Sequence, residues 1–146
     1  MVAQYEAKYL SKPEGRQMLA IDWNAKVKEA LQRTDIMALS TIGDDGSWTS
    51  PVQFTYSSRL ELSFLSMIDT KHVTNILKDP RVSVAIYKPE PLPGGGNLGL
   101  QIKGTAKIVN GEHETNGWHR FQITPEEVWF FDSRVSLRRQ KIDLQT

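Results

Sequence analysis

Apolar side chains recur at every second position through most of residues 36–87 and again after residue 98. A period of two places these side chains on one face of a β-strand, so the pattern predicts strands rather than helices. We expect strands over residues 36–42, 47–56, 60–64, 81–87, 99–109, 120–124 and 128–131. Six or seven strands in one domain predict a mainly β protein folded as a small closed barrel, because closure removes exposed sheet edges.

Short helices interrupt this pattern. Residues 22–33 carry apolar side chains at helical spacing behind Asp22, which is a favourable N-cap residue. A second helix is expected over residues 70–77, before Pro80 ends it. We also expect one or two helical turns over residues 111–118.

The connections between strands carry their own signals. The sequence Gly43-Asp-Asp-Gly46 predicts a tight turn. Pro51 lies inside the second strand and removes a ladder donor, so this strand should be at an edge, bulged, or open to a ligand. Prolines and glycines over residues 89–96 predict a flexible loop, and residues 124–127 predict a turn between the last two strands.

Length and composition limit the class of protein. A chain of 146 residues predicts a single domain over residues 1–146, with residues 1–21 as an N-terminal extension and residues 133–146 as a C-terminal tail. The net charge of +1 gives no electrostatic reason to expect nucleic acid or an anionic membrane. The chain has no cysteine, which excludes disulfides and thiolate chemistry. The N-terminus lacks the apolar segment of a signal peptide, so we expect a cytoplasmic protein.

A polar corner follows the third predicted strand. Ser66, Thr70 and Lys71 stand where the chain enters the second helix. Free backbone N–H groups and the helix dipole favour an anion at such a point. Lys71 opposes the dipole unless an anion compensates it, so a phosphate partner explains it better than a solvated lysine does. The other interpretation is that Ser66 and Thr70 only cap the helix, with Asp69 as a competing cap.

Histidines and aromatic residues give weaker signals. His72, His113 and His119 share no metal-ligand spacing, so we predict no metal site and expect surface histidines. The basic residues Arg138, Arg139 and Lys141 near the C-terminus form a short tail that is expected to be solvated or to reach a partner's cleft. Four aromatic residues near the C-terminus are expected in the core or at a dimer interface: Trp118, Trp129, Phe130 and Phe131.

Several short motifs follow one another in a fixed order between residues 22 and 132. They are Leu39-Ser-Thr, Gly46-x-x-x-x-Pro51, Leu62-x-Phe-x-Ser66-x-x-x-x-Lys71-x-x-x-Asn75-x-x-x-Asp79-Pro80-Arg81-Val82, Gly104-Thr-Ala106-Lys-Ile and Ile123-Thr-Pro125-Glu126. This arrangement resembles the pyridoxamine 5′-phosphate oxidase-like family, the FMN-binding split barrels. The resemblance implies a split β-barrel of Greek-key type and a homodimer with FMN in clefts between the protomers.

The resemblance also implies which residues bind the cofactor. The corner after the third strand would hold the flavin phosphate, and the second strand would lie against the isoalloxazine ring. The implied cofactor-binding residues are Thr49, Ser50, Pro51, Val52, Gln53, Phe64, Ser66, Thr70, Lys71 and Gln101. No catalytic residue is identified.

The sequence departs from the oxidases that give the family its name. Their second-strand arginine falls near Thr49, and their Arg-Lys pair reads Thr70-Lys71. Their glutamine aligns near Gly99, two positions before Gln101. Their Trp-Arg tail motif is matched loosely by Trp129, Arg134 and Arg138. We therefore do not expect pyridoxamine phosphate oxidase activity itself.

The function implied by the resemblance is an FMN-dependent oxidoreductase that transfers hydride or electrons. NAD(P)H or another small molecule would be its partner, and the substrate is unspecified. The alternatives are a non-enzymatic flavin or electron carrier, a split barrel that binds deazaflavin F420 or haem, and a dimeric protein whose corner binds some other phosphate.

Overall fold

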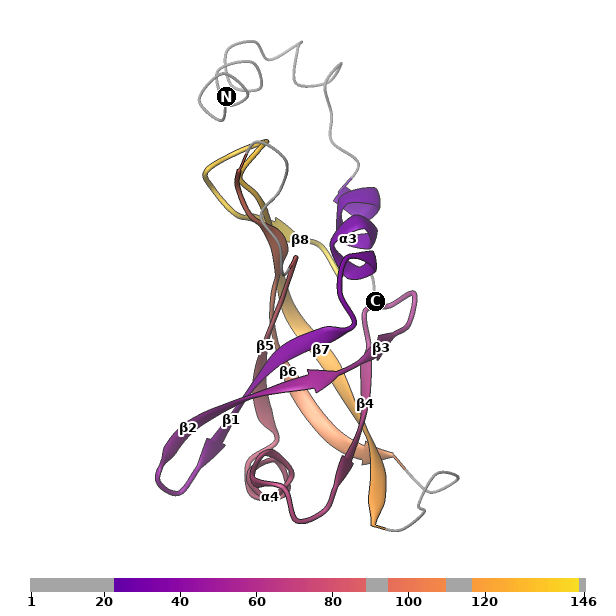
Figure 1. Cartoon of the computed structure of the whole chain (residues 1–146), viewed down its shortest axis with the longest axis vertical. Coiled ribbons are helices and arrows are strands. Elements are labelled where there is room, and N and C mark those ends of the chain that lie inside the picture. Colours follow the sequence, from indigo (N-terminus) through magenta and orange to yellow (C-terminus); the bar gives the residue numbers. More distant parts are fainter. Residues whose placement is uncertain (1–22, 89–94, 110–116, 145–146) are drawn as a thin grey trace.

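A computed structural model describes residues 23–88, 95–109 and 117–144 (Figure 1). These residues form two helices and eight strands. The helices are α3 (Trp23–Gln32) and α4 (Lys71–Lys78), and the strands are β1 (Ile36–Gly43), β2 (Gly46–Gln53), β3 (Thr55–Tyr56), β4 (Leu62–Met67), β5 (Arg81–Tyr87), β6 (Leu98–Val109), β7 (Trp118–Asp132) and β8 (Gln140–Ile142). None of the helices in the described ranges is long and apolar enough to cross a membrane.

All strand pairs are antiparallel and belong to one curled sheet. Seven strands follow the order β2-β1-β5-β6-β7-β4-β3, and β8 pairs with β7. Strands β2 and β3 lie at opposite ends of this order, although only Phe54 separates them in the chain. The sheet therefore curls until one segment supplies both of its edges (Figure 1). The prediction of a closed barrel is corrected to a split one, because β2 pairs with β1 alone among the described strands.

The core lies on the concave side of the sheet and follows the predicted alternation. Buried side chains from every second position of the strands form one cluster with the apolar faces of both helices. Phe121 on β7 is fully buried and stacks on Phe64 of β4, with 5.2 Å between the ring centroids. Helix α3 buries Val27, Ala30 and Leu31, as its predicted spacing required.

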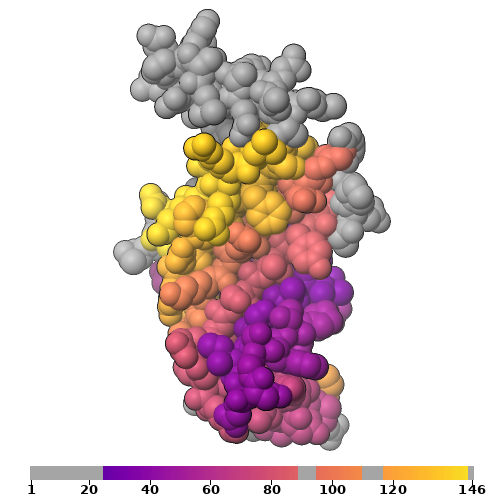
Figure 2. Space-filling view, turned by 90° about the vertical axis from the view of Figure 1, so that its left-hand side faces the viewer, coloured from indigo at the N-terminus to yellow at the C-terminus, as the bar shows by residue number. Residues whose placement is uncertain are grey.

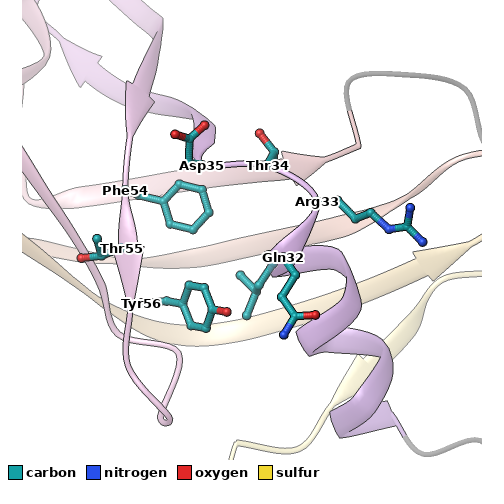
Figure 3. A pocket seen from close by; sticks show the side chains of 8 residues that line it. Gln32, Arg33, Thr34, Asp35, Phe54, Thr55 and Tyr56 are labelled. Carbon is teal, nitrogen blue, oxygen red and sulfur yellow. The ribbon is translucent and has the colours of Figure 1, made fainter.

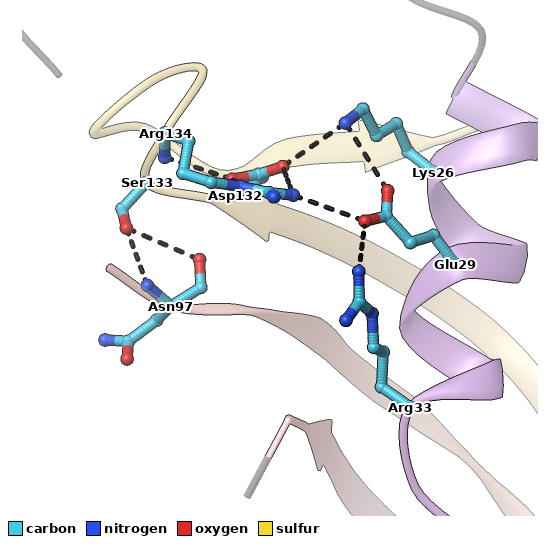
Figure 4. A network of polar contacts seen from close by, with 7 residues as sticks. All are labelled: Lys26, Glu29, Arg33, Asn97, Asp132, Ser133 and Arg134. Carbon is cyan, nitrogen blue, oxygen red and sulfur yellow. Dashed lines mark hydrogen bonds and ion pairs between the residues drawn. The ribbon is translucent and has the colours of Figure 1, made fainter. Parts of the chain in front are cut away.

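A network of charges fastens α3 to the end of β7 (Figure 4). The Asp132 carboxylate accepts hydrogen bonds from Arg134 Nε at 2.9 Å and Arg134 Nη2 at 2.8 Å. Lys26 of α3 lies 3.5 Å from the same carboxylate. Glu29 of α3 lies 3.0 Å from Arg33 and 3.4 Å from Arg134. The helix is thus joined to the sheet by ion pairs as well as by its buried apolar face.

Two predicted features of the strands are wrong. The expected turn over residues 124–127 does not exist, because β7 runs unbroken through it. A register shift pairs Lys103 with Glu127 and Gly104 with Pro125, which leaves Glu126 as the extra residue of a bulge in β7, so the proline is accommodated without a turn. The expected strand over residues 47–56 divides at Phe54 into β2 and β3, which pair with different neighbours.

Other differences are smaller. Strand β4 extends to Met67, so Ser66 lies on the strand and not in the turn. Strand β8 was not predicted and lies inside the expected C-terminal tail. Predictions for residues 1–22, 89–94 and 110–116 fall outside the described residues.

Candidate functional site

Ser66 lies at the end of β4, where the strand leads into α4. Its side chain shares the inward face of β4 with Leu62 and Phe64, and the residue is only 5% exposed. Its Oγ lies 2.6 Å from His72 Nε2 and 3.4 Å from Thr70 Oγ1. Ser66 and Thr70 therefore lie together, and the imidazole of His72 joins them.

Thr70 is the N-cap residue of α4 by position, but its hydroxyl does not cap the helix. The hydroxyl donates instead to the backbone oxygen of Met67 at 2.9 Å. Its single proton is used there, so Thr70 Oγ1 can only accept a hydrogen bond from Ser66 or His72. The alternative interpretation that Thr70 caps the helix is therefore wrong, and its side chain leaves the first N–H groups of α4 uncapped.

His72 is the functional candidate that the sequence did not reveal. We expected a surface histidine, but its ring is partly buried against Phe64 and hydrogen-bonded to Ser66. Burial lowers the pKa of His72 below the ordinary value for histidine. The feature of the sequence that could have identified His72 is its position next to Lys71 in the first turn of α4.

Lys71 lies between two side chains of the β1–β2 hairpin. Its ammonium is 3.3 Å from an Asp45 carboxylate oxygen and 4.3 Å from the ring centroid of Trp48. The hydrogen bond from Lys71 lowers the pKa of Asp45. Lys71 is thus a partly exposed cation in the first turn of α4 that is already paired with a carboxylate. The sequence did not predict either contact.

The same hairpin is seated on α4 by three further contacts. Lys78 lies 2.9 Å from Asp44. Asn75 donates to the Thr41 hydroxyl at 3.0 Å in a buried hydrogen bond. A Cβ added to Gly43 would lie 2.7 Å from the Asn75 side-chain oxygen, so the backbone of the hairpin approaches α4 closely.

Strand β2 is an edge strand, which is one of the three arrangements that Pro51 predicted. Thr49 and Pro51 are exposed on its outer face, where Thr49 Oγ1 lies 2.8 Å from Ser40 Oγ. The opposite face carries Ser50 and the buried Val52. Gln53 ends the strand with an exposed side chain. The edge of β2 that turns away from β1 has no paired strand among the described residues, so its backbone groups can meet a ligand or a second chain.

Gln101 lies on the outer, convex face of the sheet and is not brought to the corner within the protomer. Its side-chain oxygen accepts a hydrogen bond from Arg139 at 3.1 Å. The Arg139 guanidinium lies 4.1 Å from the ring centroid of Trp129, whose indole N–H donates to Glu127 at 2.6 Å. This hydrogen bond lowers the pKa of Glu127. Figure 2 views the molecule from this side, with β1 and β2 in its lower half and the C-terminal residues in yellow above them.

A separate pocket of about 530 Å³ lies where α3 ends and β2 passes into β3 (Figure 3). The rings of Phe54 and Tyr56 form one wall, and Gln32 and the turn after α3 form the other. None of the residues predicted to bind a cofactor lines it.

Comparisons with known proteins agree with this fold. The structure resembles a protein from Clostridium acetobutylicum that is related to general stress protein 26 and described as of the pyridoxinephosphate oxidase family. The two share 14% sequence identity with a TM-score of 0.67, and the match covers 85% of this chain and 97% of that one. An FAD-binding protein from Mesorhizobium loti gives 19% identity, a TM-score of 0.60 and coverage of 71% and 88%. HutZ, the haem storage protein from Vibrio cholerae, gives 17% identity, a TM-score of 0.63 and coverage of 73% and 92%.

At these identities the solved structures establish the fold alone. No match is found among curated proteins. The family model for pyridoxamine 5′-phosphate oxidase, however, matches residues 24–139, which is most of the chain. The chain therefore belongs to the pyridoxamine 5′-phosphate oxidase-like family, and its curled sheet is a split barrel of that family.

Proposed function

We propose that this protein binds FMN, with the flavin phosphate at the corner between β4 and α4, and acts in hydride or electron transfer. The observation that carries the proposal is the cluster of Ser66, Thr70 and His72 at the start of α4, where Lys71 is the first residue of the helix. Family membership and the FAD-binding neighbour support a flavin as the ligand.

The donors at this corner fit a phosphate group. Lys71 supplies a full positive charge, and the N–H groups at the start of α4 have no side-chain cap. Ser66 and the neutral imidazole of His72 can turn their shared hydrogen bond toward an oxyanion. The corner therefore offers a phosphate hydrogen-bond donors in addition to the charge of Lys71.

The edge of β2 fits the ring of the flavin. Residues 49–53 present an unpaired backbone edge, and Pro51 has no N–H to leave unsatisfied there. Backbone groups of such an edge can hydrogen-bond the polar side of an isoalloxazine. When bound, the flavin supplies the hydride or electron transfer, and the residues of this chain bind and orient it.

We propose a cytoplasmic homodimer as the working form. Small side chains on the outer face of the sheet, such as Ala38, Ser40 and Ala85, leave a surface against which a second copy can pack. The cluster of Gln101, Arg139 and Trp129 lies on this face as well. In the proposed dimer this cluster would approach the partner's cofactor. Gln101 would then contact a cofactor that it does not reach within its own protomer. NAD(P)H or another small molecule is the proposed electron partner.

Haem is the competing ligand, because a neighbouring structure is a haem storage protein. The side chains at the corner favour the flavin phosphate over haem. Lys71 and the N–H groups at the start of α4 suit an anionic phosphate, and His72 Nε2 is hydrogen-bonded to Ser66 at 2.6 Å. Deazaflavin F420 also carries phosphate, and titration with F420 distinguishes it from FMN. Reduction by NADH or NADPH distinguishes an enzyme from a carrier.

The test is to purify the protein and to titrate it with FMN, F420 and haemin by absorbance and fluorescence. We expect FMN to bind and NADH or NADPH to bleach the flavin band; binding without bleaching indicates a carrier. Binding of haemin with a sharp Soret band and no binding of FMN would overturn the proposal.

Lys71→Ala tests the place of the phosphate. It should weaken FMN binding by about 1.5–3 kcal/mol, the usual loss of a charged hydrogen bond. Lys78→Ala is the matched control, because Lys78 is on the same helix and also pairs with an aspartate of the hairpin. Equal effects of the two substitutions would show that the phosphate is not at Lys71.

A further inference from the structure

We propose that Asp45 competes with the ligand's phosphate for Lys71 and so tunes the affinity for the phosphate end alone. The inference rests on the proposed function, since it concerns the same lysine. It assigns a role to a hairpin residue that neither the sequence pattern nor the comparisons single out.

The contact between Asp45 and Lys71 places an anion where the phosphate is proposed to bind. The carboxylate oxygen lies 3.3 Å from the ammonium nitrogen, and the Trp48 ring lies on the ammonium at 4.3 Å. Both Lys71 and Asp45 remain partly open to solvent, at 43% and 75% side-chain exposure. A phosphate can therefore reach Lys71 from solvent, but it has to displace or share with Asp45.

The position of Asp45 is set by the way the hairpin sits on α4. The close approach of Gly43 to Asn75 and the Lys78–Asp44 ion pair hold the turn against the helix. Gly46 closes the turn with a φ of 121°, a value that favours glycine. The carboxylate of Asp45 is thus delivered to Lys71 by a fixed turn, and not by a long side chain that samples many positions.

The consequence is a selective effect on ligands. A phosphate dianion that binds Lys71 leaves Asp45 without its partner and close to a second negative charge. Riboflavin has the same ring as FMN and no phosphate, so it leaves the Lys71–Asp45 pair intact. Removing the charge of Asp45 should therefore strengthen FMN binding and leave riboflavin binding unchanged.

The experiment compares FMN and riboflavin affinities, from quenching of flavin fluorescence, in wild type and in Asp45→Asn. Because exposed ion pairs are weak, we expect FMN affinity to rise about two- to fivefold. Asp44→Asn is the matched control: it makes the same charge change one residue away, at the pair with Lys78. It should leave both affinities as they are in wild type.

A double substitution tests whether Asp45 acts through Lys71. In a Lys71→Gln background, Asp45→Asn should give no further gain. A gain that persists there, an equal gain from Asp44→Asn, an unchanged or weaker FMN affinity, or a parallel gain for riboflavin would each overturn the inference while leaving flavin binding established. Failure of wild type and all variants to bind FMN would overturn the proposed function, and this inference with it.

Discussion

Replacing Asp132 by asparagine should destabilise the protein through loss of the network that joins α3 to β7. The Asp132 side chain is 1% exposed, and its two oxygens accept hydrogen bonds from Arg134 Nε, Nη2 and backbone N at 2.9, 2.8 and 3.0 Å. Asparagine keeps the shape and one acceptor oxygen. Its amide NH₂, however, would face a guanidinium that has only donors.

The expected loss follows from these contacts. Hydrogen bonds to charged groups contribute about 1.5–3 kcal/mol each, and breaking a fully buried pair costs about 3–5 kcal/mol. Arg134 is 31% exposed and retains Glu29 at 3.4 Å, so water and Glu29 recover part of the loss. We therefore expect a loss of about 2 kcal/mol, which corresponds to a fall in Tm of about 4–8 °C for a chain of this size.

The assay is urea and thermal unfolding followed by tryptophan fluorescence. The chain supplies its own control in Asp79, which accepts from Arg81 backbone N, Nε and Nη2 at 3.1, 3.0 and 2.7 Å in the same arrangement. The Arg81 side chain is 69% exposed, so Asp79→Asn should have a much smaller effect. Equal losses from the two substitutions would refute the argument that burial gives the Asp132 network its strength.

The effect should also depend on pH. Burial raises the pKa of Asp132, but the hydrogen bonds from Arg134 and the charge of Lys26 outweigh it, and the pKa in the folded protein is lowered. The unfolded chain therefore binds this proton first, at about pH 3.9. The stability difference between wild type and Asp132→Asn should be complete above that pH and shrink as the pH falls through the lower folded pKa.

Two glycines and one histidine give further predictions. Gly104→Ala places a Cβ against the Thr124 backbone oxygen at the bulge and should cost about 1–3 kcal/mol of unfolding free energy, because backbone has to move. Gly43→Ala meets the Asn75 side chain, which can move only by disturbing its buried hydrogen bond to Thr41, and should cost less than Gly104→Ala. The reverse order in thermal unfolding would contradict this. Burial lowers the pKa of His72, so its NMR titration should have a midpoint below about 6.5, and its contribution to stability, complete above that pH, should decrease as the pH falls. A midpoint at or above the ordinary value would show that the ring is not buried in solution.

Local periodicity predicted the strands whose faces differ clearly in polarity. Strand β5 has the predicted bounds, because Val82, Val84 and Ile86 alternate with exposed neighbours. Strand β7 was divided wrongly, because Pro125 followed by two glutamates has the composition of a turn. Its continuity depends on a bulge formed with β6, which is a contact between distant segments.

Sequence neighbours account for part of the candidate site, and contacts between elements account for the rest. Ser66 and Thr70 lie together, directly before Lys71, because a strand end leads into a helix start. His72 reaches Ser66 only because β4 extends to Met67, which the pattern did not indicate. Asp45 meets Lys71 across a gap of 26 residues, through the seating of the hairpin on α4.

The edge of β2 that no described strand pairs with has a consequence for aggregation. An exposed sheet edge is a template on which the strand of an unrelated chain can add, and such addition leads to aggregation. Here Pro51 interrupts the row of donors, and two ion pairs, Lys71–Asp45 and Lys78–Asp44, cover the end of the hairpin. The edge of β2 is therefore a poor site for the strand of a wrong partner.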